Sequence, residues 1–345
     1  MNKKMLVLGT GAIGSCIGAD LARAGHDVLL VDQWPAHVEA MKTSGIRTAT
    51  AAEEHLTSVR AVHLCEVCGL RQLFDIVFLT AKSYDTVWLV HFIKPYLKSG
   101  GVLVSIQNSL NDEWIAPIIG RERDVGCVIE LSAEIFVPGV VQRNTDRSRT
   151  WFAVGELDGR MTPRLQAIAH ILSAAGKAET TDNVWGAKWS KLAVNCMTQA
   201  AIGILGVHEW EATHIPELFD LCIRLGRECV QVGAKLGYAM EPIFGLNAEA
   251  FMDSSDGALK NMLKTLISHI GKSARNSMLQ DHLKGRKSEV DLLNGLVVQK
   301  GRQAGMPTPL NEQMVLLTRR IELGTLKPDR SNLAMLEKLT SLSAG

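Results

Sequence analysis

Short runs of apolar residues recur through the first half of the chain, separated by segments with helical spacing. The runs that predict strands are Met5–Leu8, Val28–Val31, Ile76–Leu79, Val102–Ile106 and Val125–Leu131. Ile13–Ala24 has helical periodicity, and Gly25 ends it. This alternation predicts a parallel sheet covered by helices. Two later runs, Val140–Arg143 and Trp151–Val154, predict a more antiparallel extension.

After about residue 180 the pattern becomes helical. Apolar residues recur at helical spacing in Val184–Leu205, Pro216–Leu236, Leu259–Ile270 and Glu289–Gln303, and a last helix with a frayed end is expected from Ser331 onward. The sequence therefore predicts an α/β protein. An N-terminal Rossmann-type parallel-sheet domain over residues 1–180 is followed by an all-helical domain over residues 181–345, with the boundary near Glu179–Asp182.

Composition narrows the function. The chain has 345 residues, 37 Lys and Arg against 36 Asp and Glu, and a formal net charge of +1. Neither nucleic acid nor a membrane surface is an expected partner, because both usually require a basic excess. No run approaches the ~18 apolar residues of a membrane span, and the N-terminus lacks a signal-peptide pattern. We expect a cytoplasmic protein, and spare apolar surface in the helical half is compatible with a homodimer.

The seven cysteines are odd in number and scattered, which is typical of reduced thiols. Cys65 and Cys68 form one Cys-x-x-Cys pair. A zinc site would need two further ligands at similar spacing, and a thioredoxin-like motif would open a helix after a strand. Neither context is predicted here, so we expect ordinary thiols and no metal site.

The first predicted strand leads into Gly9-Thr10-Gly11-Ala12-Ile13-Gly14, which opens a helix. This is the context of a dinucleotide-binding loop. Gly9 allows the tight turn, Gly11 lets the backbone approach the pyrophosphate, and Gly14 lets helix and strand pack closely. The helix N-terminus faces the negative charge. The alternative is a plain glycine turn between strand and helix.

Asp32 ends the second predicted strand, 18 residues beyond Gly14. A carboxylate there can accept hydrogen bonds from the adenosine ribose and repels a 2′-phosphate. Gln33 adds no positive charge. These residues favour NAD, with NADP as the alternative because His37 and Lys42 follow and could reach a phosphate.

Two constellations in the helical half could carry chemistry. Lys191 and Asn195 are four residues apart and share one face of an otherwise apolar helix. A lysine in a partly dry site can deliver a proton to a developing alkoxide. The alternative is a solvated lysine. Glu289, after Ser288, either holds Lys191 or a substrate hydroxyl in position, or it caps the helix predicted to begin there.

Together these residues resemble the ketopantoate reductase (2-dehydropantoate 2-reductase) family over nearly the whole chain. The resemblance rests on the glycine loop, Lys82, Asn108 in Ile106-Gln-Asn-Ser, Lys191-Leu-Ala-Val-Asn195, Ser277-Met-Leu-Gln-Asp281 and Glu289-Val-Asp followed by Asn294-Gly295. It implies a Rossmann domain and an all-helical domain with the active site between them.

The resemblance also implies roles for individual residues. Lys191 would be the catalytic acid or base at the substrate carbonyl or hydroxyl, and Glu289 would support it. Asn195 would bind the substrate hydroxyl and Ser277 its carboxylate. Asn108 would position both nicotinamide and substrate, and Lys82 would lie near the adenosine end of the cofactor or in the cleft.

Three departures concern specificity. Ser109 stands where the family usually has glycine, Gln199 where a second asparagine is common, and Asp32-Gln33 where an arginine often matches NADP. Gln199 is therefore a candidate substrate-binding residue that changes the pocket. We expect hydride transfer between NAD(P) and a 2-oxo or 2-hydroxy acid, ketopantoate or a related one. The alternatives are a β-hydroxyacid dehydrogenase and a redox sensor that binds NAD without turnover.

Overall fold

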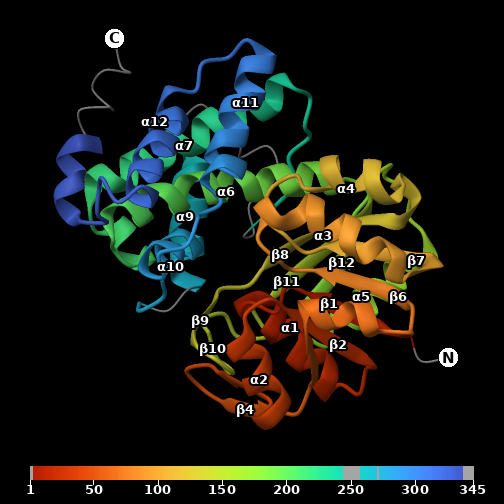
Figure 1. Ribbon diagram of the computed structural model, residues 1–345. Helices are drawn as coiled ribbons and strands as arrows, with labels where there is room; N and C mark the ends of the chain where they lie inside the picture. Colours follow the sequence, from red (N-terminus) through yellow and green to blue (C-terminus); the bar gives the residue numbers. More distant parts are fainter. Residues whose placement is uncertain (1–2, 244–256, 270–271, 337–345) are drawn as a thin grey trace. The chain divides into compact units, whose positions relative to one another are not determined.

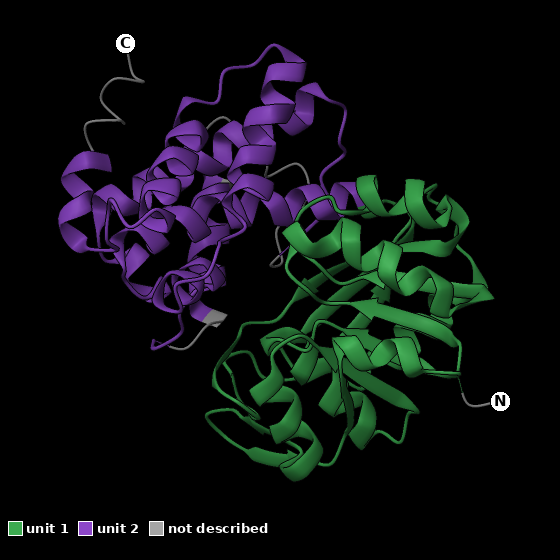
Figure 2. Ribbon diagram, in the orientation of Figure 1, with its two compact units in different colours: residues 1–184 green, residues 185–345 purple. Residues whose placement is uncertain are grey.

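The computed structural model describes residues 3–243, 257–269 and 272–336, and it divides the chain into two compact units, residues 1–184 and 185–345 (Figure 2). The end of the predicted helix Leu259–Ile270 and the tail beyond residue 336 lie outside the described residues.

Unit 1 is built on an eight-stranded sheet in the order β12-β11-β8-β7-β6-β1-β2-β5 (Figure 1). Its strands are β1 (Met5–Leu8), β2 (Val28–Asp32), β5 (Arg60–His63), β6 (Phe74–Leu79), β7 (Leu97–Ser105), β8 (Asp124–Glu130), β11 (Trp151–Glu156) and β12 (Lys177–Thr180). Neighbouring strands are parallel except β8 and β11, which are antiparallel. The predicted α/β fold with a parallel sheet is confirmed.

Helices cover both faces of this sheet. They are α1 (Ala12–Arg23), α2 (Pro35–Ser44), α3 (Thr86–Ile93), α4 (Asp112–Ile119) and α5 (Pro163–Leu172), joined by the short 3₁₀ helices η1 (Leu64–Gly69), η2 (Ser83–Asp85), η3 (Lys94–Tyr96) and η4 (Arg121–Arg123). The alternating side chains of β1 enter different cores: Met5 and Val7 pack with residues of α1 and α5, whereas Leu6 and Leu8 pack with residues of α3 and α4. Burial on both faces explains why the central strands are continuous apolar runs.

A second, four-stranded sheet has the order β4-β3-β10-β9. It contains β3 (Ile46–Ala49), β4 (Glu54–Thr57), β9 (Ala133–Val137) and β10 (Val140–Arg143). The predicted extension is therefore split between the sheets. Val140–Arg143 is antiparallel to β9 and parallel to β3, whereas Trp151–Glu156 joins the large sheet antiparallel to β8.

Unit 2 is helical. Its elements are α6 (Val184–Leu205), η5 (Glu209–Thr213), α7 (Pro216–Lys235), α9 (Gly257–His269), α10 (Ser277–Leu283), η6 (Val290–Leu292), α11 (Asn294–Ala304), α12 (Pro309–Glu322) and η7 (Arg330–Asn332). The single helix predicted over Glu289–Gln303 is wrong at its start. Leu293, with φ −110° and ψ −93°, interrupts the helical backbone, so the long helix begins only at Asn294.

A polar contact network joins three helices of unit 2. The Glu228 carboxylate on α7 accepts hydrogen bonds from the backbone N–H groups of Leu310 and Asn311, each at 3.0 Å, at the start of α12. Asn311 also accepts a hydrogen bond from Asn294 of α11, at 2.9 Å. Burial raises the pKa of Glu228, and the hydrogen bonds from α12 oppose that shift. The network thus supplies partners for backbone donors that begin a helix.

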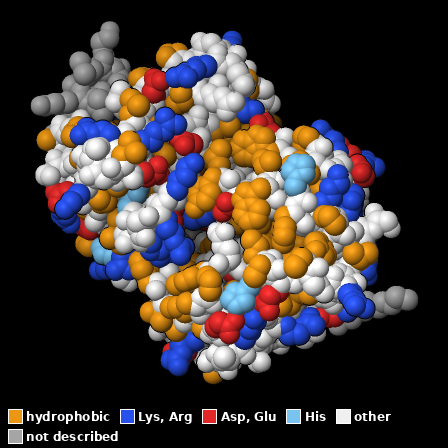
Figure 3. All heavy atoms as spheres, in the orientation of Figure 1, with side chains coloured by type: hydrophobic (Ala, Val, Ile, Leu, Met, Phe, Trp, Pro, Cys, Tyr) orange, Lys and Arg blue, Asp and Glu red, His pale blue; other side chains and the backbone are white. Residues whose placement is uncertain are grey.

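The visible surface (Figure 3) agrees with the even charge balance of the sequence. On the face shown in Figure 3, Lys and Arg side chains alternate with acidic and apolar ones and form no single basic surface. Among the helices that the structure describes, none has the length and apolar character needed to cross a bilayer.

Candidate functional site

The glycine loop connects β1 to α1 at the carboxyl edge of the large sheet. Gly9 has φ +89°, and a Cβ there would lie 2.6 Å from backbone atoms of Ala81. A Cβ on Gly14 would lie 2.5 Å from the carbonyl oxygen of Gly9. A Cβ on Gly11 would meet nothing within 4 Å. The outer two glycines are therefore required by the protein's own packing, whereas the middle one leaves open space where a pyrophosphate is expected to approach.

The buried His37 is connected to this loop through Ser15. Ser15 Oγ donates to the carbonyl oxygen of Thr10 at 2.9 Å and lies 3.0 Å from His37 Nε2. The backbone N–H of Gly139 donates to His37 Nδ1 at 2.9 Å, so that nitrogen carries no proton and Nε2 donates to Ser15. Burial lowers the pKa of His37 to about 4. The expectation that His37 could reach a phosphate is wrong, because its ring is neutral, fully buried and hydrogen-bonded at both nitrogens.

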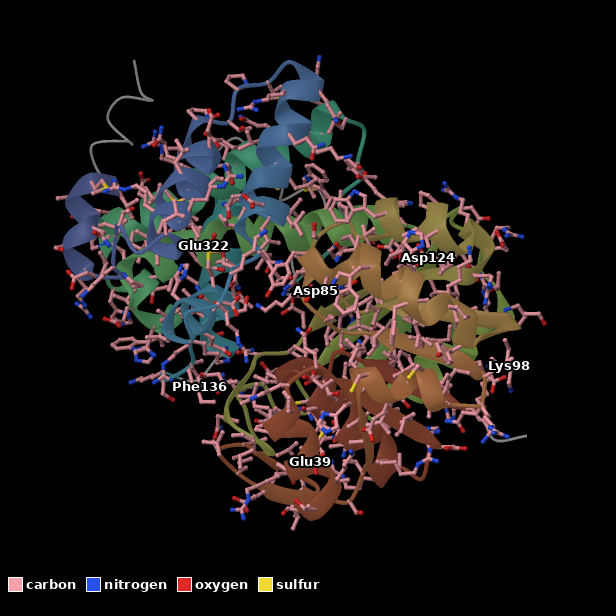
Figure 4. The ribbon with its side chains drawn as sticks, viewed as in Figure 1. Glu39, Asp85, Lys98, Asp124, Phe136 and Glu322 are labelled. Carbon is pink, nitrogen blue, oxygen red and sulfur yellow. The ribbon has the colours of Figure 1, made fainter. Side chains whose placement is uncertain are left out.

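Asp32 ends β2 beside the loop, where its side chain is buried and accepts a hydrogen bond from the backbone N–H of Trp34 at 2.8 Å. Lys42, the other candidate for a phosphate contact, is bound by two carboxylates. Its Nζ lies 3.2 Å from Glu39 on α2, labelled in Figure 4, and 2.9 Å from Glu66 on η1. Lys42 is thus already paired with two acidic groups.

Lys82 and Asn108 follow the neighbouring strands β6 and β7. The carbonyl oxygen of Asn108 accepts hydrogen bonds from Ser83 Oγ at 3.0 Å and from Asn111 Nδ2 at 2.8 Å, which ties the two loops together. Ser109 has φ +77° and is the only non-glycine residue with positive φ in the described part of the chain. It adopts a glycine conformation at the position where the resemblance expects glycine, and such a backbone stores on the order of 1 kcal/mol of strain.

In unit 2, Lys191, Asn195 and Gln199 lie four residues apart on α6 and so form one line along the helix. Lys191 is half-buried and Asn195 is buried. The Oε1 atom of Gln199 accepts hydrogen bonds from Ser277 Oγ at 3.0 Å and from the Met278 backbone N–H at 3.3 Å. The structure thus brings two of the predicted substrate-binding residues into direct contact.

Asn276 is a supporting residue that the sequence analysis missed. Its Nδ2 atom donates to the carbonyl oxygens of Thr198 and Gln199, at 3.1 and 3.2 Å, and its Oδ1 atom caps α10 by accepting from Leu279 N–H at 2.8 Å. The asparagine immediately before a helix is a recognisable cap signal. Its second function, holding α10 against α6, has no local sequence signal.

Glu289 is buried and immediately precedes η6. Its carboxylate makes no capping hydrogen bond, so the capping interpretation of Glu289 is wrong. The adjacent Ser288 supplies the cap instead: its Oγ accepts a hydrogen bond from the Val290 N–H at 3.3 Å, while its own N–H and Oγ donate to Glu322 at 2.8 and 2.6 Å. The buried Glu289 carboxylate therefore has no role in starting the helix that would explain its presence.

Chemically, unit 1 offers a glycine loop beside a buried carboxylate, and unit 2 offers a lysine, two amides, a hydroxyl and a buried carboxylate. Among residues 3–243, 257–269 and 272–336, no group of three or more His, Cys, Asp or Glu side chains has the arrangement of a metal site. The described residues thus combine groups that can bind a nucleotide with groups that can bind and protonate a small oxygen-rich molecule.

Comparison with known families identifies the family to which the chain belongs. The model of ketopantoate reductase PanE/ApbA matches residues 5–157, and the model of its C-terminal domain matches residues 183–322. The chain belongs to the ketopantoate reductase family. It is therefore a nicotinamide-dependent oxidoreductase that acts on a CH–OH group, as the sequence analysis predicted.

Individual relatives agree with this assignment. The 2-dehydropantoate 2-reductase of Archaeoglobus fulgidus is 28% identical over 93% of this chain and 99% of its own. A crystal structure of a PanE/ApbA family ketopantoate reductase from Ralstonia eutropha has 28% identity and a TM-score of 0.77, covering 93% of this chain and 99% of that one. D-mandelate dehydrogenase with NADH and anilino(oxo)acetate shares the fold, with a TM-score of 0.80 at 21% identity and the same coverage.

Proposed function

We propose that this enzyme interconverts a 2-oxo acid and the corresponding 2-hydroxy acid, ketopantoate or a close relative of it, with NAD(H). The observation that carries the proposal is the polar line Lys191, Asn195 and Gln199 on an otherwise buried helix, with Ser277 hydrogen-bonded to its last member. An apolar helix has no structural need for such a line, whereas a small acid with a carbonyl and a carboxylate needs several polar partners. The names of the relatives, 2-dehydropantoate 2-reductases, support the substrate class.

The cofactor would be held by unit 1. The contributing residues are Gly9, Thr10, Gly11, Ala12, Ile13 and Gly14 of the loop, with Asp32, Lys82 and Asn108. When bound, the nicotinamide supplies a hydride to, or removes one from, the substrate carbon. NAD is preferred in this proposal, because Asp32 repels a 2′-phosphate and Lys42 is already bound by Glu39 and Glu66.

Lys191 acts at the substrate oxygen. Reduction of a carbonyl leaves an alkoxide that needs a proton, and an ammonium group both stabilises that charge and donates the proton. In the reverse direction the same nitrogen takes the hydroxyl proton. The buried Glu289 carboxylate orients the lysine or the hydroxyl, Asn195 binds the hydroxyl, and Ser277 with Gln199 receives the carboxylate end.

The substitution Lys191→Ala tests this assignment. We expect kcat to fall by roughly 10²–10⁴-fold, the usual contribution of a positioned proton donor, while the Kd of NADH stays within twofold of wild type. Lys235→Ala, at the exposed end of α7, is the matched control and should leave both quantities unchanged. Near-normal turnover of the Lys191→Ala enzyme would remove this residue from the mechanism.

A substrate panel tests the reaction class. Ketopantoate and other 2-oxo acids, their 2-hydroxy counterparts and several 3-hydroxy acids are compared with NAD(H) and NADP(H). We expect the highest kcat/KM for a 2-oxo or 2-hydroxy acid with NAD(H). Preference for 3-hydroxy acids would indicate a β-hydroxyacid dehydrogenase instead. Binding of NADH without turnover of any acid would indicate a sensor.

A further inference from the structure

Two of the seven cysteines differ from the rest. Cys65 and Cys68 are exposed, whereas the other five are buried. Both were predicted to be ordinary thiols, in part because no helix was expected to open there after a strand. That expectation is wrong: both residues lie on η1 (Leu64–Gly69), which begins directly after β5 (Arg60–His63). The pair therefore lies on a helical turn directly after a strand, although this turn is a short 3₁₀ helix and not the α-helix of a thioredoxin-like motif.

The local geometry puts the two cysteines on one face of a turn, at the Cα separation of a disulfide, so that a tightening of the turn can bring the sulfurs together. A 3₁₀ helix has three residues per turn, so side chains at i and i+3 eclipse, and its rise of about 2.0 Å per residue separates their Cα atoms by about 6 Å. That separation lies inside the range of about 4.4–6.8 Å found for disulfides. Cys68 Sγ lies 3.0 Å from the carbonyl oxygen of Cys65, so this thiol points back along the turn toward its partner residue.

The pair lies beside the part of the sheet that would receive the adenosine. In the parallel pairing of β2 and β5, Asp32 is opposite His63, the residue that precedes η1. Glu66, between the two cysteines, accepts a hydrogen bond from the His63 N–H at 2.7 Å and from Lys42 Nζ at 2.9 Å. A change in the shape of η1 is therefore transmitted to the groups around Asp32.

We propose that Cys65 and Cys68 form a reversible intramolecular disulfide by exchange with a low-molecular-weight disulfide, and that this bond weakens binding of the dinucleotide. One thiolate attacks the small disulfide and releases one small thiol. The second thiolate then attacks the mixed disulfide and releases the other. Two protons leave the cysteines, and two electrons pass to the oxidant. The second half of this inference rests on the proposed NAD(H) site.

The disulfide is expected to weaken dinucleotide binding because its formation displaces existing hydrogen bonds. Cys68 Sγ must leave the Cys65 carbonyl and bond to Cys65 Sγ, which tightens the turn that presents Glu66. Glu66 then loses its geometry toward the His63 N–H and toward Lys42. The position of Asp32 relative to η1 changes as well, because Asp32 lies on β2, the hydrogen-bonded neighbour of β5.

Peptide mapping tests bond formation without any activity measurement. The full-length protein is equilibrated with oxidised glutathione, alkylated under denaturing conditions and digested with trypsin. Cleavage after Arg60 and Arg71 isolates one peptide, residues 61–71, that contains both cysteines. We expect it to be unalkylated and about 2 Da lighter than the reduced peptide, and to take up two alkyl groups once it is reduced with dithiothreitol and alkylated again. Two alkylated thiols, or stable glutathione adducts on both residues, would overturn the proposal.

Titration of NADH tests the effect on the cofactor. Oxidised and reduced wild type are compared with a Cys65→Ser, Cys68→Ser double variant treated in the same way. We expect oxidation to raise the Kd of NADH by about 3–10-fold in wild type and to leave the double variant unchanged. An equal Kd for both wild-type forms would overturn the regulatory part. Both measurements are independent of the acid substrate, so a failed substrate panel would not affect them.

Discussion

Substitution of single glycines in the loop distinguishes a cofactor site from a structural turn. We compare Gly11→Ala with Gly14→Ala. A Cβ on Gly14 would lie 2.5 Å from the Gly9 carbonyl oxygen and from Thr80 Oγ1, and the carbonyl is backbone that cannot move without opening the turn. Such overpacking costs about 1–3 kcal/mol. A Cβ on Gly11 meets no atom within 4 Å, and its φ of −66° suits any residue.

The Gly11→Ala variant should therefore lose mainly NADH affinity, and the Gly14→Ala variant mainly stability. Gly11 is the helix N-cap, where alanine is less favourable, so we allow up to about 1 kcal/mol of destabilisation for Gly11→Ala. Its Kd for NADH should rise by roughly 10–100-fold, because the new methyl group occupies the space of the pyrophosphate. Gly14→Ala should instead show the larger drop in the urea midpoint of unit 1, followed by circular dichroism.

Two outcomes would contradict this assignment of Gly11. If Gly11→Ala binds NADH as tightly as wild type, the open space beside that residue does not receive the cofactor. If Gly11→Ala is as unstable as Gly14→Ala, the loop is held by contacts other than those described, and the glycine pattern reports packing alone. Near-wild-type stability with lost NADH affinity is the expected combination for Gly11→Ala only.

Three further predictions concern neighbouring residues. Asp32→Asn should shift the ratio of NADPH to NADH affinity toward NADPH by about tenfold, measured by titration of both cofactors; an unchanged ratio would show that Asp32 does not select NAD. Ser109→Gly should raise stability by about 1 kcal/mol in thermal denaturation, since glycine adopts φ +77° without strain; a lower melting temperature would show that the serine side chain contributes more than the strain costs. His37 is neutral in the folded state, with its pKa lowered to about 4, but takes up a proton near pH 6.5 when unfolded. Stability should therefore be full above pH 6.5 and fall by about 3 kcal/mol as the pH drops to about 4; a His37→Gln variant should lose this slope in urea titrations at several pH values.

Much of the fold follows from local pattern, and the misses have a common physical cause. Met5–Leu8 and Val184–Leu205 were predicted with the observed bounds, since one is buried on both faces and the other has long helical periodicity. Arg60–His63 was not predicted, because an edge strand with exposed and half-buried positions has no continuous apolar run. Missing that strand also hid the strand-to-helix context of Cys65 and Cys68.

In the candidate site, too, local features could be predicted and long-range contacts could not. The turn from β1 into α1 at the glycine loop could be predicted from the pattern, because the strand, the glycines and the helix are neighbours in sequence. The contact between Gln199 and Ser277 joins residues on two different helices, and spacing says nothing about it. His37 was misjudged for a similar reason: its buried, neutral state depends on the N–H of Gly139, supplied from more than a hundred residues later in the chain.

The parallel pairing of β3 with β10 has a consequence for how the protein is made. Arg47 is opposite Val140, so the small sheet cannot close until the ribosome has added about ninety further residues. Closing so long a loop costs chain entropy and slows folding. Gly139, which holds His37 beneath the glycine loop, arrives with β10. The glycine loop is therefore synthesised long before the residue that completes the support of His37.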